Sequence, residues 1–466
     1  MFSISSIQLE SLLGPWRRDG PAYADLASRI RQLIHDAMIA QEARLPAERA
    51  LAARLGISRN TVTGAYGLLR DQGYLVGRRG AGSYARVPPR PQGRPAPGGS
   101  HPRTAGVIDL TAALVPDPEP ALGAVLAELA GDRPRRSAGH DPLGIPELRQ
   151  AIADRYTARG LPTRADSIVV TGGRHQALDL LLRVLVEPGR RVVVDCPAGP
   201  AVLDAIRTAR ARPVSVGLGP DGWQVQALTS AIGGAGVCAA YLMPDFHYPT
   251  GQLMPGQARA AIVQAAESAG VIIVADDSLA DVVIDNVELP RPLAWHARRG
   301  GVISIGSLAE PLWAGLGIGW LRAAPRLVSR LARLRPGPDA ACSLIEQLVA
   351  CRMLARYEEL LAARRTVLAG RRATLTAALA AELPGWRFTR PAGGLSLWVQ
   401  LDAPVSDELA TAGPAHGVLV SAGPRYGAVP GTLRQYVCLP YVQDAATLRE
   451  GIRRLAAARA SLGGRR

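Results

Sequence analysis

The sequence predicts an α/β protein with two domains: a small one over residues 1–86 and a large one over residues 107–466. Three observations support this. Three helical patterns and two short strands fill the first 86 residues, whereas short β-branched runs alternate with helical patterns from residue 167 onward. Between them lies VPPRPQGRPAPGGSHPRTAG, residues 87–106, which is dense in proline and glycine and predicts a semi-rigid linker.

The composition is typical of a globular cytoplasmic protein. Apolar residues make up 48% and charged residues 20%, which excludes a disordered chain. No apolar run reaches the roughly 18 residues of a membrane span, and the start MFSISSIQLESLL lacks a basic segment and a cleavage pattern. We therefore expect a cytoplasmic location, including the nucleoid if the chain binds DNA, and no membrane partner.

Cysteine and histidine usage does not predict a metal site. The five cysteines are dispersed without a CxxC pair, a pattern typical of free buried thiols in an intracellular chain. The seven histidines are equally dispersed and offer no zinc-ligand spacing. We expect no metal.

The kind of basic residue is more informative than the net charge of +15, which on its own only indicates a polyanionic partner. The chain contains no lysine, so all 54 basic residues are arginine. Coding bias alone can produce such usage. Its chemical consequence holds in either case, because no side-chain primary amine exists to form a Schiff base.

The small domain is predicted to be three helices followed by a two-stranded wing. Pro21 opens the first helix, PAERALAARLG supplies the second, and Ser58 is a suitable N-cap for the third, which Gly73 ends. The strands YLV and SYA flank RRGAG.

This arrangement predicts a DNA interface. A short link between the second and third helices places Ser58, Arg59, Asn60 and Thr61 where a recognition helix meets the major groove. In the wing, Arg78 and Arg79 precede Gly82 and could reach the backbone or the minor groove. The alternative is a solvated three-helix scaffold with surface arginines.

The segment RLPAERALAARLGISRNTV, followed by AY, DQGYL and GAGSYA, resembles the winged helix-turn-helix domain of the GntR family of regulators over its full length. The resemblance implies binding to a double-stranded DNA operator. It places Arg49, Arg59, Thr61 and Gly82 at positions that the family uses at DNA.

The large domain is predicted to contain a mostly parallel sheet with helices on both faces. The strand candidates are SIVVTGG, RRVVVDC, PVSVGL, VCAAYLMP, VIIVADD, VISIGS and GIGWLR. Long arginine-rich helices, then GLSLWVQL and LRQYVCLPY, predict a C-terminal α+β subdomain after about residue 340. Ligands of such sheets bind at the carboxyl ends of the strands.

In order and spacing, the segments from HDPLGIPELRQ through VVTGGRHQALDL, YLMPDFHYPTG, IIVADDS and SIGSLAEPLWAGLGIGWL to LRQYVCLPY resemble the fold-type-I aminotransferases, which bind pyridoxal phosphate. Together with the first domain, the chain resembles the MocR-type subgroup of GntR regulators. That resemblance implies a head-to-tail homodimer and a large domain that senses a small-molecule effector.

The position that decides covalent chemistry has changed. Counting from the turn Gly306-Ser307 places Glu310 where the resemblance implies the Schiff-base lysine. A carboxylate cannot form an imine and would repel a phosphate ester. We therefore expect no catalytic residue and no covalent cofactor; pyridoxal phosphate could bind at most noncovalently.

Three more positions depart from the family pattern. An arginine expected to hold the phosphate is replaced in Gly315-Leu316-Gly317, and an aromatic residue expected to stack on the ring is missing from Pro197-Ala198-Gly199-Pro200. Ser278 stands where a tyrosine would bond the ring hydroxyl.

Other features of the pocket remain. By resemblance, Asp276 matches the partner of the pyridine nitrogen and Arg434 matches the clamp for a substrate carboxylate. Each could equally be a structural charge in the core or in an ion pair. The strand-to-helix turn at Thr171 to Arg174 lies where phosphate is normally bound. The predicted ligand pocket or remnant cofactor pocket consists of Gly173, Arg174, His175, Tyr248, Asp276, Ser278, Ser307, Glu310 and Arg434.

Three functions follow from these observations. The first is a DNA-binding regulator with a catalytically dead aminotransferase-like domain, whose acids Asp276 and Glu310, together with Arg434, hold an amine or amino-acid-like ligand. In the second, the large domain is only a dimerisation scaffold. The third, an active transaminase, conflicts with the absence of lysine.

Overall fold

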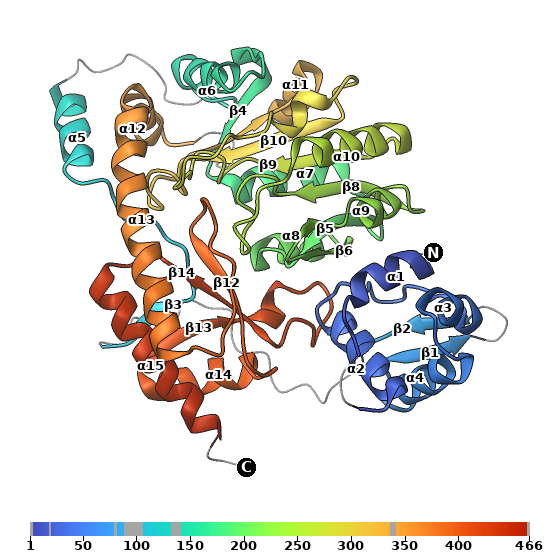
Figure 1. Cartoon of the computed structure of the whole chain (residues 1–466). Helices are drawn as coiled ribbons and strands as arrows, with labels where there is room; N and C mark the ends of the chain where they lie inside the picture. The colour runs from blue at the N-terminus through green and yellow to red at the C-terminus, as the bar shows by residue number, and fades with distance from the viewer. Residues whose placement is uncertain are drawn as a thin grey trace.

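The computed structural model describes residues 3–17, 20–78, 82–87, 106–131, 141–335 and 342–463 (Figure 1). Apart from its two end residues, the predicted linker at residues 87–106 lies outside these ranges. None of the helices in the described ranges has the length and apolarity of a membrane span.

The small domain has the predicted helices and wing. It contains α2 (Ala22–His35), α3 (Glu48–Leu55), α4 (Arg59–Asp71), β1 (Leu75–Arg78) and β2 (Gly82–Ala85). The left-handed Gly56 caps α3, as its sequence position predicts. β1 and β2 pair antiparallel. Their apolar faces form one core with the helices, which includes Leu26, Ile30, Leu51, Val62 and Leu69.

An additional helix, α1 (Ser6–Leu13), precedes this unit and was not predicted from the sequence. Ser5 and Gln8 form a capping box at its start. Leu9 and Leu13 are buried in the core of the small domain, and Arg54 on α3 forms an ion pair with Glu10. α1 therefore packs as part of this domain.

The large domain is built on an eight-stranded sheet in the order β4-β11-β10-β9-β8-β5-β6-β7. β11 is antiparallel to both its neighbours and β7 is antiparallel to β6, whereas β10, β9, β8, β5 and β6 run parallel. The strands are β4 (Ile168–Thr171), β5 (Arg191–Cys196), β6 (Arg212–Gly219), β7 (Gly222–Trp223), β8 (Val237–Leu242), β9 (Ile272–Asp276), β10 (Val302–Ser307) and β11 (Gly319–Arg322).

Helices cover both faces of this sheet. Alternate residues of a strand point to opposite faces, so Val193 packs in one core cluster and its neighbours Val192 and Val194 pack in another. The first cluster takes residues from α6 (Pro146–Ala158), α9 (Val225–Ile232), α10 (Gly256–Ala269) and α12 (Leu344–Ala355). The second takes residues from α7 (Arg174–Leu185), α8 (Pro200–Thr208) and α11 (Pro325–Arg333). The predicted α/β class is confirmed.

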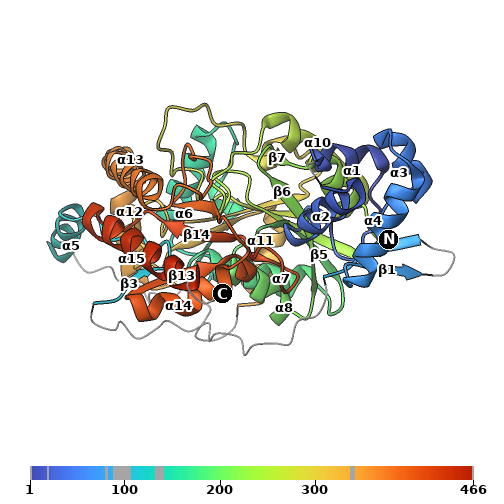
Figure 2. The same cartoon turned by 60° about the horizontal axis from the view of Figure 1, so that its bottom comes forward.

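The C-terminal subdomain has its own sheet, in the order β12-β14-β13-β3. It comprises β12 (Ser396–Gln400), β14 (Tyr436–Pro440), β13 (Val418–Ala422) and β3 (Ile108–Leu110), a short strand from the start of the large domain that was not predicted. The helices α13 (Tyr357–Glu382), α14 (Ser406–Ala412) and α15 (Ala445–Gly463) pack against it. Figure 2 shows the helices of this subdomain toward one end of the molecule and the winged helix domain at the other.

The winged helix domain rests on the large domain through the turn that ends α2. Leu433 N donates to His35 O at 2.6 Å, and the Gln435 side chain donates to the Asp36 carboxylate. Gly217 on β6 has room for the turn only because it lacks a side chain, since a Cβ there would lie 2.9 Å from Ala37 O. Both views show the domain beside β6 (Figures 1 and 2).

Candidate functional site

The predicted DNA interface begins at the N-terminus of α4. Ser58 is its N-cap, and its Oγ accepts a hydrogen bond from Thr61 N at 3.1 Å and lies 2.8 Å from Thr61 Oγ1. The two hydroxyls therefore fix the first turn of the helix. Their predicted contact with DNA phosphates stays a prediction.

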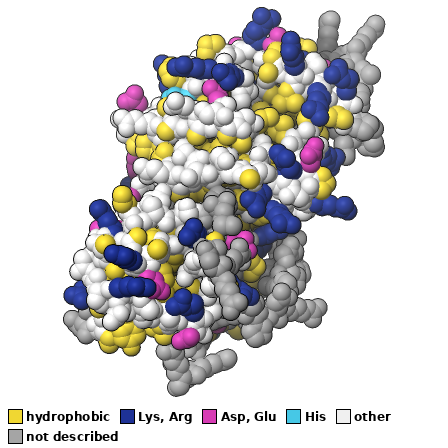
Figure 3. Space-filling view, turned by 90° about the vertical axis from the view of Figure 1, so that its right-hand side faces the viewer, with side chains coloured by type: hydrophobic (Ala, Val, Ile, Leu, Met, Phe, Trp, Pro, Cys, Tyr) yellow, Lys and Arg dark blue, Asp and Glu magenta, His cyan; other side chains and the backbone are white. Residues whose placement is uncertain are grey.

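Arg59, the first residue of α4, is exposed to solvent. Its side chain is 70% exposed in the full chain, and its Nε lies 4.0 Å from Glu48 Oε2, so it is held only loosely. Arg49 and Asn60 are exposed beside it. Figure 3, which faces the side of the molecule that carries this domain, shows arginine side chains spread over the surface with acidic ones among them.

The wing is only partly described. Gly82 begins β2 with a φ of +99°, a left-handed conformation that suits glycine. Arg78 is the last residue of β1, but its side chain and the whole of Arg79 lie outside the described residues.

The predicted pocket of the large domain lies at the carboxyl ends of β4, β9 and β10. Gly173, with a φ of +90°, caps α7 and places Arg174 in its first turn. Gly319 allows this turn to pack closely, because a Cβ on it would lie 2.4 Å from the Gly173 carbonyl carbon. Ser307 ends β10 and accepts a hydrogen bond from Ala309 N at 2.9 Å.

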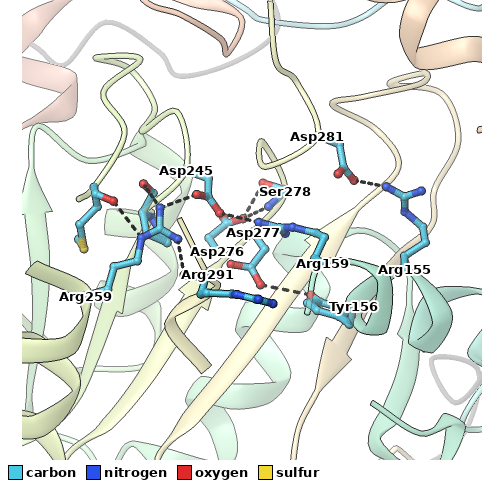
Figure 4. A network of polar contacts seen from close by, with 12 residues as sticks. Arg155, Tyr156, Arg159, Asp245, Arg259, Asp276, Asp277, Ser278, Asp281 and Arg291 are labelled. Atoms are coloured by element: carbon cyan, nitrogen blue, oxygen red, sulfur yellow. Dashed lines mark hydrogen bonds and ion pairs between the residues drawn. The ribbon is translucent and has the colours of Figure 1, made fainter. Parts of the chain in front are cut away.

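Asp276, at the end of β9, is fully buried and has both carboxylate oxygens engaged. Oδ1 accepts from Ser278 N at 3.0 Å and from Ser278 Oγ at 2.5 Å. Oδ2 accepts from Arg174 Nη1 at 3.1 Å and from the Tyr241 hydroxyl. Four donors thus satisfy the carboxylate. Figure 4 shows the pair of bonds from Ser278.

Arg174 also reaches Glu310, so one guanidinium joins two acids. Its Nε lies 2.7 Å from Glu310 Oε1, and the two side chains are only 18% and 15% exposed. Burial raises the pKa of Glu310, and Arg174 opposes the rise. Burial favours the neutral form of Arg174, but the two carboxylates outweigh it and raise the pKa of Arg174. Glu310 Oε2 is buried and has no hydrogen bond of good geometry within the described residues, although the nearby Ser307 side chain helps to lower the pKa of Glu310.

The remaining cavity is small. Only about 10 Å³ of enclosed space remains beside Arg174, far below the roughly 300–1,000 Å³ of most ligand sites. Tyr248, one of the predicted residues, lines it, and its hydroxyl lies 3.1 Å from that of Tyr426. Asp276 and Glu310 contact Arg174 but do not line this cavity. His175 is exposed on α7. The sequence reasoning missed three of the lining residues: Asp195, Tyr241 and His247.

Arg434 does not join the two acids, so this part of the predicted pocket is corrected. Its Nη2 lies 2.5 Å from Glu408 Oε1 and its Nε lies 3.3 Å from Asp407 Oδ2. Both acids are on α14, close to the β13–β14 connection that carries the arginine. The structural ion pair, one of the alternatives left open by the sequence, is the arrangement found.

The next residue, Asp277, belongs to a second polar network, which Figure 4 shows with Tyr156, Arg159 and Asp245. Tyr156 donates to its Oδ2 at 3.3 Å, and burial raises its pKa to about 6 while Arg159 opposes the rise. Arg159 and the fully buried Arg259 both bind Asp245, at 3.1 and 2.6 Å. This network ties α6 and α10 to the end of β9. It contains no cluster of three or more ligands for a metal within the described part of the chain.

The fold and the site define a two-part class of protein: a winged helix domain joined to an aminotransferase-like domain. The family of aminotransferases of class I and II matches residues 106–455, and the gntR family of bacterial regulatory proteins matches residues 22–84. The chain belongs to the aminotransferase class I and II family in its large domain and carries a GntR-family domain at its N-terminus.

Its full-length relatives are regulators. The uncharacterized HTH-type transcriptional regulator YdcR of Escherichia coli is 30% identical over 85% of this chain and 90% of its own length. The HTH-type transcriptional regulator TauR of Rhodobacter capsulatus is 27% identical over 93% and 96%. A solved structure, the alpha-aminoadipate aminotransferase LysN of Thermus thermophilus complexed with N-(5'-phosphopyridoxyl)-L-leucine, has a TM-score of 0.71 at 25% identity and covers 77% of this chain and 94% of its own. The chain is a DNA-binding transcription regulator of the MocR/GntR type.

Pyridoxal phosphate, which this family normally binds, does not fit the residues present. The carboxylate expected to meet the pyridine nitrogen is already satisfied by four donors. The position expected to supply the amine is Glu310, and its carboxylate is bound to Arg174. We derive no reaction step through the cofactor.

Proposed function

We propose that this regulator binds its operator through Arg59 and its neighbours and that its large domain is catalytically inactive. The proposed inactivity of the large domain rests on Glu310, which stands where the family resemblance puts the Schiff-base lysine. No other lysine can take its place, because the chain has none, and so no side-chain amine is present for transamination. The same observation argues against a working transaminase. In this account the chain acts in the cytoplasm, on DNA.

We propose a head-to-tail homodimer as the active form. Two recognition helices, spaced by one helical turn of DNA or a multiple of it, read two half-sites and add their contacts. The contact between the α2 turn and the β6 edge of the large domain supports a close association of the two kinds of domain. This contact lies within one chain. We propose that in the dimer the same surface of the partner chain's large domain can hold the winged helix domain.

Arg59 is proposed to read a base or a phosphate. Arg59→Ala should weaken binding to a DNA duplex selected on the wild type by about 1–3 kcal/mol if the side chain reads a base. Fluorescence anisotropy measures this loss. Arg54→Ala is the matched control, since it also removes an exposed arginine but one that pairs with Glu10 on α1. Equal affinities of the two variants would remove Arg59 from the interface.

The effector, if there is one, is proposed to be a small amine or an amino acid. The buried, unpaired Glu310 Oε2 is an acceptor for an ammonium group, and two acids share a single guanidinium. Wild type should gain thermal stability with a primary amine from a panel, and Glu310→Gln should not. No gain with any amine would favour the scaffold function, in which the large domain only dimerises the winged helices.

A further inference from the structure

We propose that the Arg174 guanidinium occupies the place of the cofactor ring, so that Arg174 itself, and not only the lost lysine, excludes pyridoxal phosphate. This assignment puts the guanidinium of Arg174 in the position of the family's cofactor ring and leaves the second oxygen of Glu310 for the proposed amine. It depends on the geometry of the large domain and is independent of operator binding.

Arg174 lies between the two residues that would contact opposite ends of the cofactor ring. In pyridoxal phosphate the ring nitrogen and the aldehyde carbon lie at opposite ends of the pyridine ring. The residues that match the partners of these two ends are Asp276 and Glu310. Arg174 now spans both of them, at 3.1 and 2.7 Å. The guanidinium donates a hydrogen bond to Asp276 and forms an ion pair with Glu310, so it lies between the two carboxylates.

Both carboxylate oxygens of Asp276 are already occupied by hydrogen-bond donors. A pyridinium N–H would need an oxygen of Asp276, yet Ser278 takes one oxygen twice, and Arg174 and Tyr241 share the other. The cofactor could enter only by displacing Arg174. That displacement would leave Glu310 buried without a cation, which is costly in a site where burial already raises its pKa.

The position of Arg174 also determines what a restored amine would meet. In Glu310→Lys the new ammonium group would face Arg174, and the two cations would compete for Asp276. Like charges at this distance in a buried site repel strongly. The lysine alone should therefore fail to bring the cofactor back, whereas the lysine combined with removal of Arg174 should succeed.

Four full-length proteins test the proposal: wild type, Glu310→Lys, Arg174→Ala and the double variant Arg174→Ala/Glu310→Lys. Each is incubated with pyridoxal phosphate and then with borohydride. The introduced amine attacks the aldehyde carbon and releases water, and hydride from borohydride converts the imine to a stable secondary amine. Because the chain has no lysine, the α-amino group is the single background site, and peptide mapping separates it from residue 310.

We expect at least tenfold more adduct at residue 310 in the double variant than in Glu310→Lys, and no cofactor retained by wild type in equilibrium dialysis. Equal labelling of Glu310→Lys and the double variant would overturn the proposal. Retention of pyridoxal phosphate by the wild type in equilibrium dialysis would also overturn it. Thermal melting checks folding, and Arg174→Gln/Glu310→Lys replaces the double variant if the alanine form does not fold.

Discussion

Arg174 and Glu310 are buried together because each compensates the other's charge, and Asp276 adds a second acid to the same guanidinium. At the scale of residues, this cluster carries the proposal that the large domain is inactive. We propose that Glu310 stands at the position of the family's amine, and its carboxylate is held by Arg174.

Arg174→Ala should lower the free energy of unfolding by about 3–5 kcal/mol near pH 8, because it leaves two buried carboxylates without a cation. Burial raises the pKa of Glu310 above its unfolded value, so the folded state binds a proton more readily. Stability is then present at low pH and lost as the pH rises. Arg174→Ala removes the cation that opposes this rise, so the buried Glu310 carboxyl of the variant takes up a proton more readily and the loss should shrink at pH 5. Urea titrations at the two pH values measure it.

Glu310→Gln is the matched control, since it removes one acid and leaves Arg174 bound to Asp276. It should cost about 1 kcal/mol or less. Similar losses for Arg174→Ala and Glu310→Gln would contradict the idea that the cation stabilises this site.

The sequence predicted some of the site residues, and the reason it failed for others is physical. Arg174, Asp276, Ser278 and Glu310 follow strands of one sheet, so their convergence at the strand ends was predictable. Arg434 was placed wrongly, because its direction depends on the acids of α14, which lie on another element. Tyr241 opens the recognised segment YLMPDFHYPTG, but nothing in its pattern shows that its hydroxyl reaches Asp276.

At the scale of elements, periodicity predicted the three helices, the wing and seven strands of the main sheet. Two of the missed strands are short, β3 with three residues and β7 with two, and a pattern of period two cannot be recognised over that length. The five-residue β13 (Val418–Ala422) was missed as well. α1 was missed although Ser5 and Gln8 form the S-x-x-Q signature of a capping box.

The N-cap of α4 provides a prediction at this scale. Ser58→Ala should destabilise the winged helix domain by about 1 kcal/mol, because Thr61 N loses its side-chain acceptor and keeps only the Ser58 carbonyl. Ser58→Gly should cost only a few tenths of a kcal/mol, since glycine is tolerated at this position. Hydrogen exchange of the α4 amides in the full chain measures both. Equal protection in Ser58→Ala and wild type would show that the cap does not stabilise the helix.

At the scale of the whole molecule, the two domains meet at a buried carboxyl group. Burial raises the pKa of Asp36 to about 7, and Arg29 and the bond from Gln435 oppose the rise. The backbone carbonyl of the adjacent His35 accepts a hydrogen bond from Leu433 N, and the His35 ring nitrogen Nδ1 lies 3.3 Å from Gly431 O. Tyr436 and Cys196 are two other titratable groups near Asp36, and the charge of Asp36 contributes to raising the pKa of both. The contact between the winged helix domain and the large domain therefore favours a protonated Asp36.

Between about pH 4 and pH 7 the folded chain keeps the proton on Asp36 while the unfolded chain loses it, so stability falls as the pH rises through this window. Asp36→Asn should flatten the pH dependence of Tm over this range, by an amount corresponding to up to about 1.4 kcal/mol per pH unit. Asp195 and Asp277 also titrate but are present in both proteins. Parallel Tm curves for the two proteins would contradict the burial of Asp36 in the folded chain.

The central claim is that this aminotransferase-like chain works on DNA without a cofactor. The most direct test is repeated selection of random double-stranded DNA on the full-length protein, with no pyridoxal phosphate present and Arg59→Ala as the control. The account predicts that wild type enriches a sequence with two half-sites separated by about 10–10.5 base pairs or a multiple, and that the variant does not. Enrichment of no sequence, or enrichment only after the cofactor is added, would contradict it.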